Sequence, residues 1–239
     1  MTDPAYAHFA ILADRTGSMG QFADGMSGPT KADLATGGIH DLIRKQAAEP
    51  GRATFSLTQF DTSPTSRWPG AGPGPCTERV ASFAAADDPL ITKWRIRPRG
   101  STPLLDAVGT EIVRTGEELA ALPENARPGR VYFVIGTDGE ENASREYSKQ
   151  QIAAMVARQH TDWHWEFVFI GADIDAFAEA GGMGFAAGST MSSSGARTVQ
   201  AYAGTSSAIS RSRIGGQSVS YTDEERAAAA GTGKPGDEE

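Results

Sequence analysis

Three runs of apolar residues predict the buried strands of the chain. They cover residues 7–13, 131–136 and 165–171, and each is nearly continuous rather than alternating. A strand that is apolar at almost every position is typical of the centre of a parallel sheet, where helices cover both faces. Residues 52–61 alternate apolar and polar side chains and predict a fourth strand, and residues 77–84 predict a weaker fifth.

Helical patterns fall between these strands. Thr30 is placed to be the N-cap of a helix that ends near residues 49–51, and Thr102 and Pro103 are placed to be the N-cap and first residue of another. Residues 144–159, 172–181 and 198–210 predict further helices, whereas the Pro- and Gly-rich residues 63–74 predict a loop. The alternation predicts an α/β fold, with a doubly wound, mostly parallel central sheet and helices on both faces.

The pattern also predicts where the domain begins and ends. We expect residues 1–6 to form an N-terminal extension and residues 7–211 to form the folded domain. Residues 212–239 contain few large apolar side chains and end in "GKPGDEE", so we expect them to form a flexible acidic C-terminal tail.

Composition narrows the function classes. The chain has 22 Lys and Arg against 30 Asp and Glu, a net charge of -8, which argues against nucleic-acid binding. We expect the surface to be acidic on average, so that long-range charge does not attract an acidic ligand. The single cysteine, Cys76, excludes an internal disulfide framework and fits the cytoplasm, and no apolar segment is long enough to cross a membrane.

Polar residues with oxygen donors follow two of the apolar strands. Asp14 ends the first strand and is followed by Thr16 and Ser18, while Asp138 ends another strand. Thr102 lies in a loop that opens a helix. Ligands of doubly wound sheets bind beside the carboxyl ends of the strands, so we expect these five residues to share one edge. Two carboxylates and three hydroxyls form a hard oxygen site that suits Mg²⁺, although such residues also cap ordinary turns.

Three motifs in this set resemble one family. "DRTGSM", "RGSTPLLDAV" and "VIGTDGEEN" are similar to the three loops of von Willebrand factor A-type (VWA) domains that form a metal-ion-dependent adhesion site, or MIDAS. The resemblance covers about residues 8–211 and is to a bacterial and phage branch of stand-alone VWA proteins. It implies direct ligation by Thr16 and Ser18, mainly water-mediated contact from Asp14 and Asp138, and direct or water-mediated contact from Thr102. Thr16 replaces the usual Ser, and residues 19–28 form an insertion.

The resemblance implies a binding function. We expect a divalent-cation-dependent protein-binding module that grips an acidic residue of a protein partner, with Mg²⁺ as the ion and Mn²⁺ or Ca²⁺ as alternatives. We expect no enzyme activity, no nucleic acid and no membrane as partner. The alternatives are a metal-free VWA scaffold and a Mg-dependent phosphatase or phosphotransferase. The second alternative is disfavoured because Thr16 stands where such enzymes need a carboxylate, and because no lysine closely precedes the "TDG" strand.

Four other acidic residues near these motifs receive structural roles. We expect Asp61 to cap a loop, Asp106 to fix the Thr102 loop, and Glu140 and Glu141 to be solvated. We expect Asp14 itself to lie on a rim loop outside the core. The "GGMGFAAG" segment imitates a dinucleotide-binding fingerprint but follows a helix rather than a strand, so it carries no function here.

Overall fold

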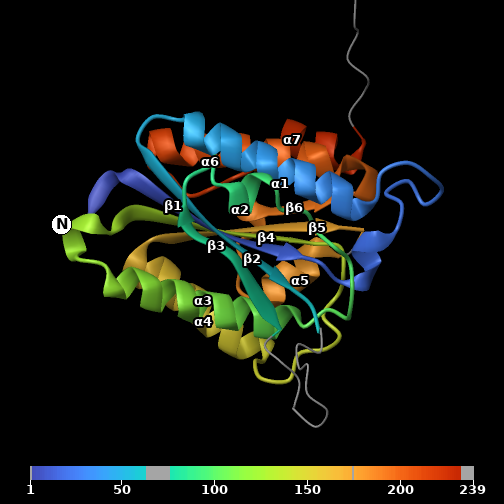
Figure 1. The fold of residues 1–239 in the computed structure, drawn as a ribbon, viewed down its shortest axis with the longest axis horizontal. Helices are drawn as coiled ribbons and strands as arrows, with labels where there is room; N and C mark the ends of the chain where they lie inside the picture. The colour runs from blue at the N-terminus through green and yellow to red at the C-terminus, as the bar shows by residue number, and fades with distance from the viewer. Residues whose placement is uncertain (1, 63–75, 174, 233–239) are drawn as a thin grey trace, which may run out of the picture.

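A central sheet of six strands organises the molecule. The computed structural model of the chain describes residues 2–62, 76–173 and 175–232, and Figure 1 shows its fold. The strand order is β3-β2-β1-β4-β5-β6, with every neighbouring pair parallel except β2 and β3. The strands are β1 (Asp3–Asp14), β2 (Arg52–Phe60), β3 (Thr77–Ala84), β4 (Pro128–Thr137), β5 (Trp165–Ala172) and β6 (Thr190–Ser193). The predicted doubly wound, mostly parallel sheet is confirmed.

Helices cover both faces of this sheet (Figure 1). On one face lie α1 (Lys31–Ala48), α2 (Pro89–Thr92), α6 (Thr198–Gly215) and α7 (Asp223–Ala230). On the other face lie α3 (Leu104–Ala121), α4 (Lys149–Trp163) and α5 (Ala176–Gly182). Among the described residues, no helix combines the length and the apolar character needed to cross a membrane.

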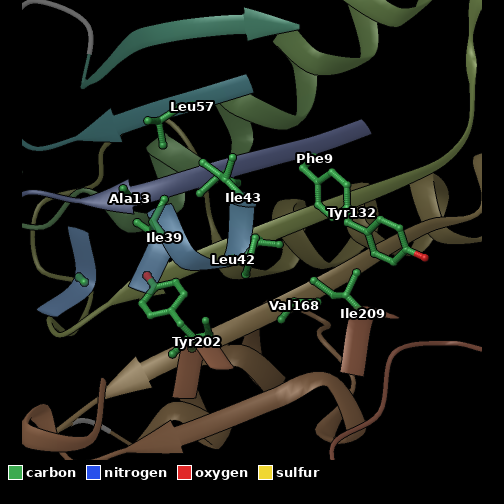
Figure 2. Close-up of a cluster of buried hydrophobic side chains, with 14 of the residues drawn as sticks. Phe9, Ala13, Ile39, Leu42, Ile43, Leu57, Tyr132, Val168, Tyr202 and Ile209 are labelled. Atoms are coloured by element: carbon green, nitrogen blue, oxygen red, sulfur yellow. The ribbon is translucent and has the colours of Figure 1, made fainter. Parts of the chain in front are cut away.

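Alternate residues of the apolar strands belong to two separate hydrophobic cores, one on each face of the sheet. Phe9 and Ile11 of β1 point to the α1–α6 face, whereas Ala10 and Leu12 point to the α3–α4–α5 face, and all four are buried. Figure 2 shows the first core, with Phe9, Leu57, Tyr132 and Val168 from the sheet and Ile39, Leu42, Tyr202 and Ile209 from the helices. Burial on both faces explains why these strands are apolar throughout.

Tyr202 of α6 packs where two glycines remove side-chain bulk. A Cβ on Gly38 of α1 would lie 2.5 Å from Cδ2 of Tyr202, and a Cβ on Gly136 of β4 would collide with its hydroxyl oxygen. The ring is 3% exposed. Tyr202 therefore fills the space between α1 and the end of β4, directly behind the residues that follow this strand.

The predicted ends of the domain are wrong. At the N-terminus, β1 begins at Asp3, which pairs with Pro128, so residues 3–6 belong to the sheet. At the C-terminus, α6 continues to Gly215 and α7 packs on the domain, with Val219, Tyr221 and Ala229 buried in the first core. A few well-placed apolar side chains are enough to hold this polar segment. The expected loop at 63–74 and residues 233–239 of the expected tail lie outside the described residues.

Candidate metal site at the carboxyl edge of the sheet

Asp14 lies at the carboxyl end of β1, beside the end of β4, where the strand order reverses direction. Its side chain is completely buried and accepts two hydrogen bonds: the Thr16 backbone N–H lies 2.6 Å from Oδ1, and the Thr137 hydroxyl lies 2.5 Å from Oδ2. The expectation of a carboxylate outside the core is therefore wrong. Burial raises the pKa of Asp14 to about 6, although the hydrogen bonds from Thr137 and Thr16 oppose this rise.

Thr16, Ser18 and Asp138 form a connected group of oxygens beside Asp14. Ser18 belongs to a short 3-10 helix, Gly17–Gly20, that begins directly after the strand end. Its hydroxyl donates to Asp138 Oδ1 at 2.7 Å and lies 3.2 Å from the Thr16 hydroxyl. Thr16 and Asp138 are buried and Ser18 is half-buried. The first and third predicted motifs thus meet, as the edge rule for doubly wound sheets requires.

Thr102 lies against the glycine that follows Asp138. A Cβ on Gly139 would be only 2.7 Å from Thr102 Oγ1, so this approach depends on the missing side chain. The Gly17 N–H donates to the Gly100 carbonyl at 3.0 Å, which ties the Thr102 loop to the loop of Thr16 and Ser18. All five predicted site residues therefore come from loops that touch one another.

The expected capping role of Thr102 is wrong by one residue. Helix α3 begins at Leu104, and its N-cap residue is Pro103. Pro103 makes no side-chain hydrogen bond to the first turn of the helix. The first N–H groups of the helix donate elsewhere: that of Leu105 to Glu141 Oε2 at 2.9 Å, and that of Asp106 to Ser144 Oγ at 3.1 Å. The Thr102 hydroxyl is consequently not used by the helix.

Glu141 and Asp106 hold the Thr102 loop to the loop after β4. Glu141 accepts from the Ala143 and Ser144 N–H groups as well as from Leu105, so the expectation that it is solvated is wrong, whereas Glu140 is exposed as expected. Asp106 accepts from three backbone N–H groups, of Arg145, Glu146 and Tyr147, at 2.7–2.9 Å. Its predicted role in fixing the loop is confirmed.

Lys31 is a site residue that the sequence reasoning missed. It is the first residue of α1, and its Nζ lies 3.1 Å from Asp138 Oδ2 and 3.1 Å from Asp173 Oδ2. Burial by itself lowers the pKa of Lys31, but the neighbouring carboxylates of Asp138 and Asp173 outweigh burial, and the pKa of Lys31 is raised. A cation thus already faces one of the two site carboxylates. Its only sequence signal is its position directly after the N-cap Thr30.

Asp61 has a different role from the one expected. Rather than capping a loop, its buried carboxylate pairs with Arg15 at 3.1 Å and with Arg99 at 2.6 Å. Arg15 lies between Asp14 and Thr16 in the chain but points to the opposite side of the loop. Asp61 therefore supports the site loop from outside and makes no contact with the oxygen group.

The oxygen group fits a hard divalent cation in its chemistry. It supplies two carboxylates and three hydroxyls, with no His or Cys, which is the donor type of Mg²⁺ and Mn²⁺. The described residues hold no group of three or more His, Cys, Asp or Glu side chains that could bind a metal. A metal at this edge would therefore need the hydroxyls of Thr16, Ser18 and Thr102 as well as the two carboxylates.

Comparison of the whole fold with solved structures agrees with the resemblance seen in the three sequence motifs. The structure of proximal thread matrix protein 1 from the mussel byssus superposes with a TM-score of 0.58 over 84% of this chain and 45% of that chain, at 14% sequence identity. The VWA domain of SpRpn10 superposes with a TM-score of 0.52 over 81% of this chain and 93% of that domain, at 10% identity. This chain has the VWA fold.

A further structure of the mussel protein is described as having a zinc-occupied MIDAS motif, and it matches this chain with a TM-score of 0.56 at 13% identity. The VWA fold of the present chain spans less than half of the length of the mussel protein. No sequence-family model and no characterised protein matches the chain at the sequence level. The expected place in a bacterial and phage branch stays a prediction.

Proposed function

We propose that this VWA domain is a protein-binding module that holds a divalent cation with Asp14, Thr16, Ser18, Thr102 and Asp138. The cation grips an acidic side chain of a protein partner. The observation that carries the proposal is the contact between Ser18 and Asp138, 2.7 Å apart, with Thr16 beside them. It joins residues 120 positions apart in the chain into one group of oxygens.

The charges of this group support binding of an acidic ligand. Asp14 and Asp138 are the two carboxylates of the group, and Lys31 neutralises part of the charge of Asp138. The three other donors are neutral hydroxyls. A cation with so few anionic donors keeps a strong attraction for another carboxylate, which a partner can supply as its last ligand.

The environment of Asp14 disfavours the phosphatase alternative. A nucleophilic carboxylate must reach the phosphorus atom, yet both oxygens of Asp14 accept internal hydrogen bonds and its side chain is fully buried. The structure does place a lysine at this edge, Lys31, which the sequence argument against the enzyme did not foresee. The lack of a carboxylate at position 16 remains, so a binding role is favoured.

The finer assignments belong to the same proposal. Mg²⁺ is the favoured ion because hydroxyls and waters satisfy its octahedral shell, and Mn²⁺ and Ca²⁺ are alternatives. We place the protein in the cytoplasm because the sequence has one cysteine and therefore no internal disulfide.

The test is capture of protein partners on the immobilised domain with and without EDTA. Binding should vanish with EDTA, return with Mg²⁺ or Mn²⁺, and be lost in Thr102→Ala. The Thr102 hydroxyl does not cap helix α3, so this variant should keep a melting temperature close to that of the wild type.

Ser101→Ala is the matched control, because Ser101 is the exposed neighbour of Thr102 and should leave capture unchanged. A partner whose affinity is the same with EDTA and in Thr102→Ala would favour the metal-free scaffold instead.

A further inference from the structure

A row of basic side chains leads up to the candidate metal site. Four of the 22 Lys and Arg residues of the chain lie in the seven-residue segment 93–99, between α2 and the Thr102 loop. Trp94 and Ile96 alternate with them and are buried. The Trp94 indole donates to Gln59 at 3.1 Å and the Ile96 N–H donates to Thr36 at 3.2 Å, so these two contacts anchor the segment. The basic side chains of the segment therefore face outward: Lys93, Arg95, Arg97 and Arg99.

These side chains line a pocket of about 400 Å³. Arg15 adds a fifth cation, and its side chain is only 7% exposed. Two carboxylates oppose them: Glu78 pairs with Arg15 at 2.7 Å, and Asp61 lies behind. Among the described residues, Lys93 and Arg97 form no ion pair, and the buried Nε of Arg15 has no hydrogen-bond partner. The pocket thus carries excess positive charge on a chain whose net charge is -8.

The pocket adjoins the metal-site loop directly. The Arg99 N–H donates to the Arg15 carbonyl at 2.8 Å, and Arg15 stands between Asp14 and Thr16 in the chain. A Cβ on Gly20 would lie 3.4 Å from the Pro98 side chain, so the basic segment also packs on the 3-10 helix of Ser18. A ligand at the metal site and a ligand in the pocket would therefore be neighbours.

We infer that this basic pocket binds an acidic segment of a protein partner, beside the carboxylate that the metal site takes. That the partner is an acidic protein rests on the proposed function. Binding of an acidic segment in the pocket does not itself require the metal ion. The expectation that long-range charge does not attract an acidic ligand concerns the average surface, and this part of the surface carries the opposite charge. The positive potential here attracts acidic side chains and speeds their encounter with the edge of the sheet.

An acidic peptide fits the pocket better than a nucleic acid. Glu78 stands among the cations with its side chain 56% exposed, and it would repel the continuous charge of a phosphate backbone. The rest of the chain also carries an excess of acidic residues, which would repel a long polyanion. In an extended peptide, acidic side chains two residues apart are separated by about 7 Å, so separate carboxylates can pass on either side of Glu78.

The test uses a defined probe in EDTA, where the metal site cannot contribute. A fluorescein-labelled decapeptide that alternates Glu and Gly is titrated with the full chain by fluorescence anisotropy. It should bind, and its affinity should fall as salt rises from about 50 mM to about 300 mM, because exposed charges are screened. Arg95→Gln/Arg97→Gln should weaken binding by about fivefold, since each exposed pair contributes little alone.

Arg44→Gln/Lys45→Gln is the matched control. It removes the same charge from an exposed part of α1 and should leave the affinity unchanged. Equal loss in both double variants, or none in Arg95→Gln/Arg97→Gln, would overturn the inference. Tighter binding of an oligothymidine of equal charge would overturn it in favour of nucleic acid. If capture of partners needs Mg²⁺ but is the same in Arg95→Gln/Arg97→Gln, the proposed function stands. Only the inference about the pocket is then overturned.

Discussion

The oxygen group and the basic pocket are neighbours that differ in the sign and in the burial of their charges. The oxygen group places Asp14 and Asp138 below the surface, among hydroxyls and one lysine. The basic pocket keeps Arg95 and Arg97 exposed and holds only Arg15 beneath them. Residues 14–18 and 99–102 contribute to both, so one pair of loops separates buried negative charge from exposed positive charge.

The comparison shows why average charge is a poor guide to a binding surface. A buried carboxylate is costly unless a cation or hydrogen bonds compensate it, so it acts at short range on an ion. Exposed arginines are screened and individually weak, but together they act at a distance on a whole ligand. The net charge of -8 describes neither region.

The largest effect is expected from removing the buried carboxylate. Asp14→Ala should abolish the binding of Mg²⁺ and Mn²⁺ that isothermal titration calorimetry detects for the wild type, because one of only two anionic donors is lost. Asp41→Ala, a change of the same size on the exposed face of α1, should keep the full heat.

If the heat of Mg²⁺ or Mn²⁺ binding is the same for Asp14→Ala as for the wild type, the ion binds at another part of the chain. Hydrolysis of a phosphomonoester by the wild type, lost in Asp14→Asn, would instead favour the phosphatase alternative.

A smaller effect is expected from pH in EDTA. The folded pKa of Asp14 is about 6, against an ordinary value of 3.8, because the side chain is buried. The unfolded chain loses this proton at lower pH, so folding is favoured below the ordinary pKa and stability falls as pH rises toward 6. The loss should be about 3 kcal/mol, since one pKa unit corresponds to about 1.4 kcal/mol.

Asp14→Asn cannot titrate and should lack this part of the pH dependence in urea unfolding. Parallel curves for the wild type and Asp14→Asn between pH 4 and pH 6 would contradict a buried carboxylate with a raised pKa. Mg²⁺ should stabilise the wild type above pH 6, where the carboxylate is ionised.

The smallest effect is expected at Lys31, the lysine that pairs with Asp138 of the oxygen group. Lys31→Met removes a cation 3.1 Å from Asp138, so Mg²⁺ should bind about tenfold more tightly by calorimetry. Lys45→Met removes an exposed lysine from the last turn of the same helix and should have little effect. Weaker Mg²⁺ binding in Lys31→Met would mean that Lys31 positions Asp138 for the ion rather than competing with it.

The fold could be predicted because its strongest signals are local. The apolar runs of β1, β4 and β5 and the N-cap Thr30 specify strands and a helix start through neighbours in the chain. The short strand β6, with the sequence "TMSS", lacks such a signal and was not predicted. The packing of α7 was missed for a related reason, because it depends on only a few apolar contacts in a polar segment.

The site could be predicted only as a group of loops. The rule that ligands bind at carboxyl ends of strands brought Asp14 and Asp138 together, but it does not say which side chains are buried. Lys31 was missed because its distance to Asp138 depends on how α1 crosses the sheet. The alternation of basic residues in the segment 93–99 was visible in the sequence, but the burial of Trp94 and Ile96 that turns it into a pocket was not.

The position of Arg15 between Asp14 and Thr16 has a thermodynamic consequence. The same short loop presents oxygens to one side and holds Asp61 and Glu78 through Arg15 on the other. An ion that shifts this loop would therefore also shift the Arg15 side of the pocket, and a peptide that shifts Arg15 would also shift the oxygens. The factor by which Mg²⁺ alters the affinity for an acidic peptide must then equal the factor by which that peptide alters the affinity for Mg²⁺. Arg15 is therefore the residue through which cooperativity between a bound ion and a bound peptide would act.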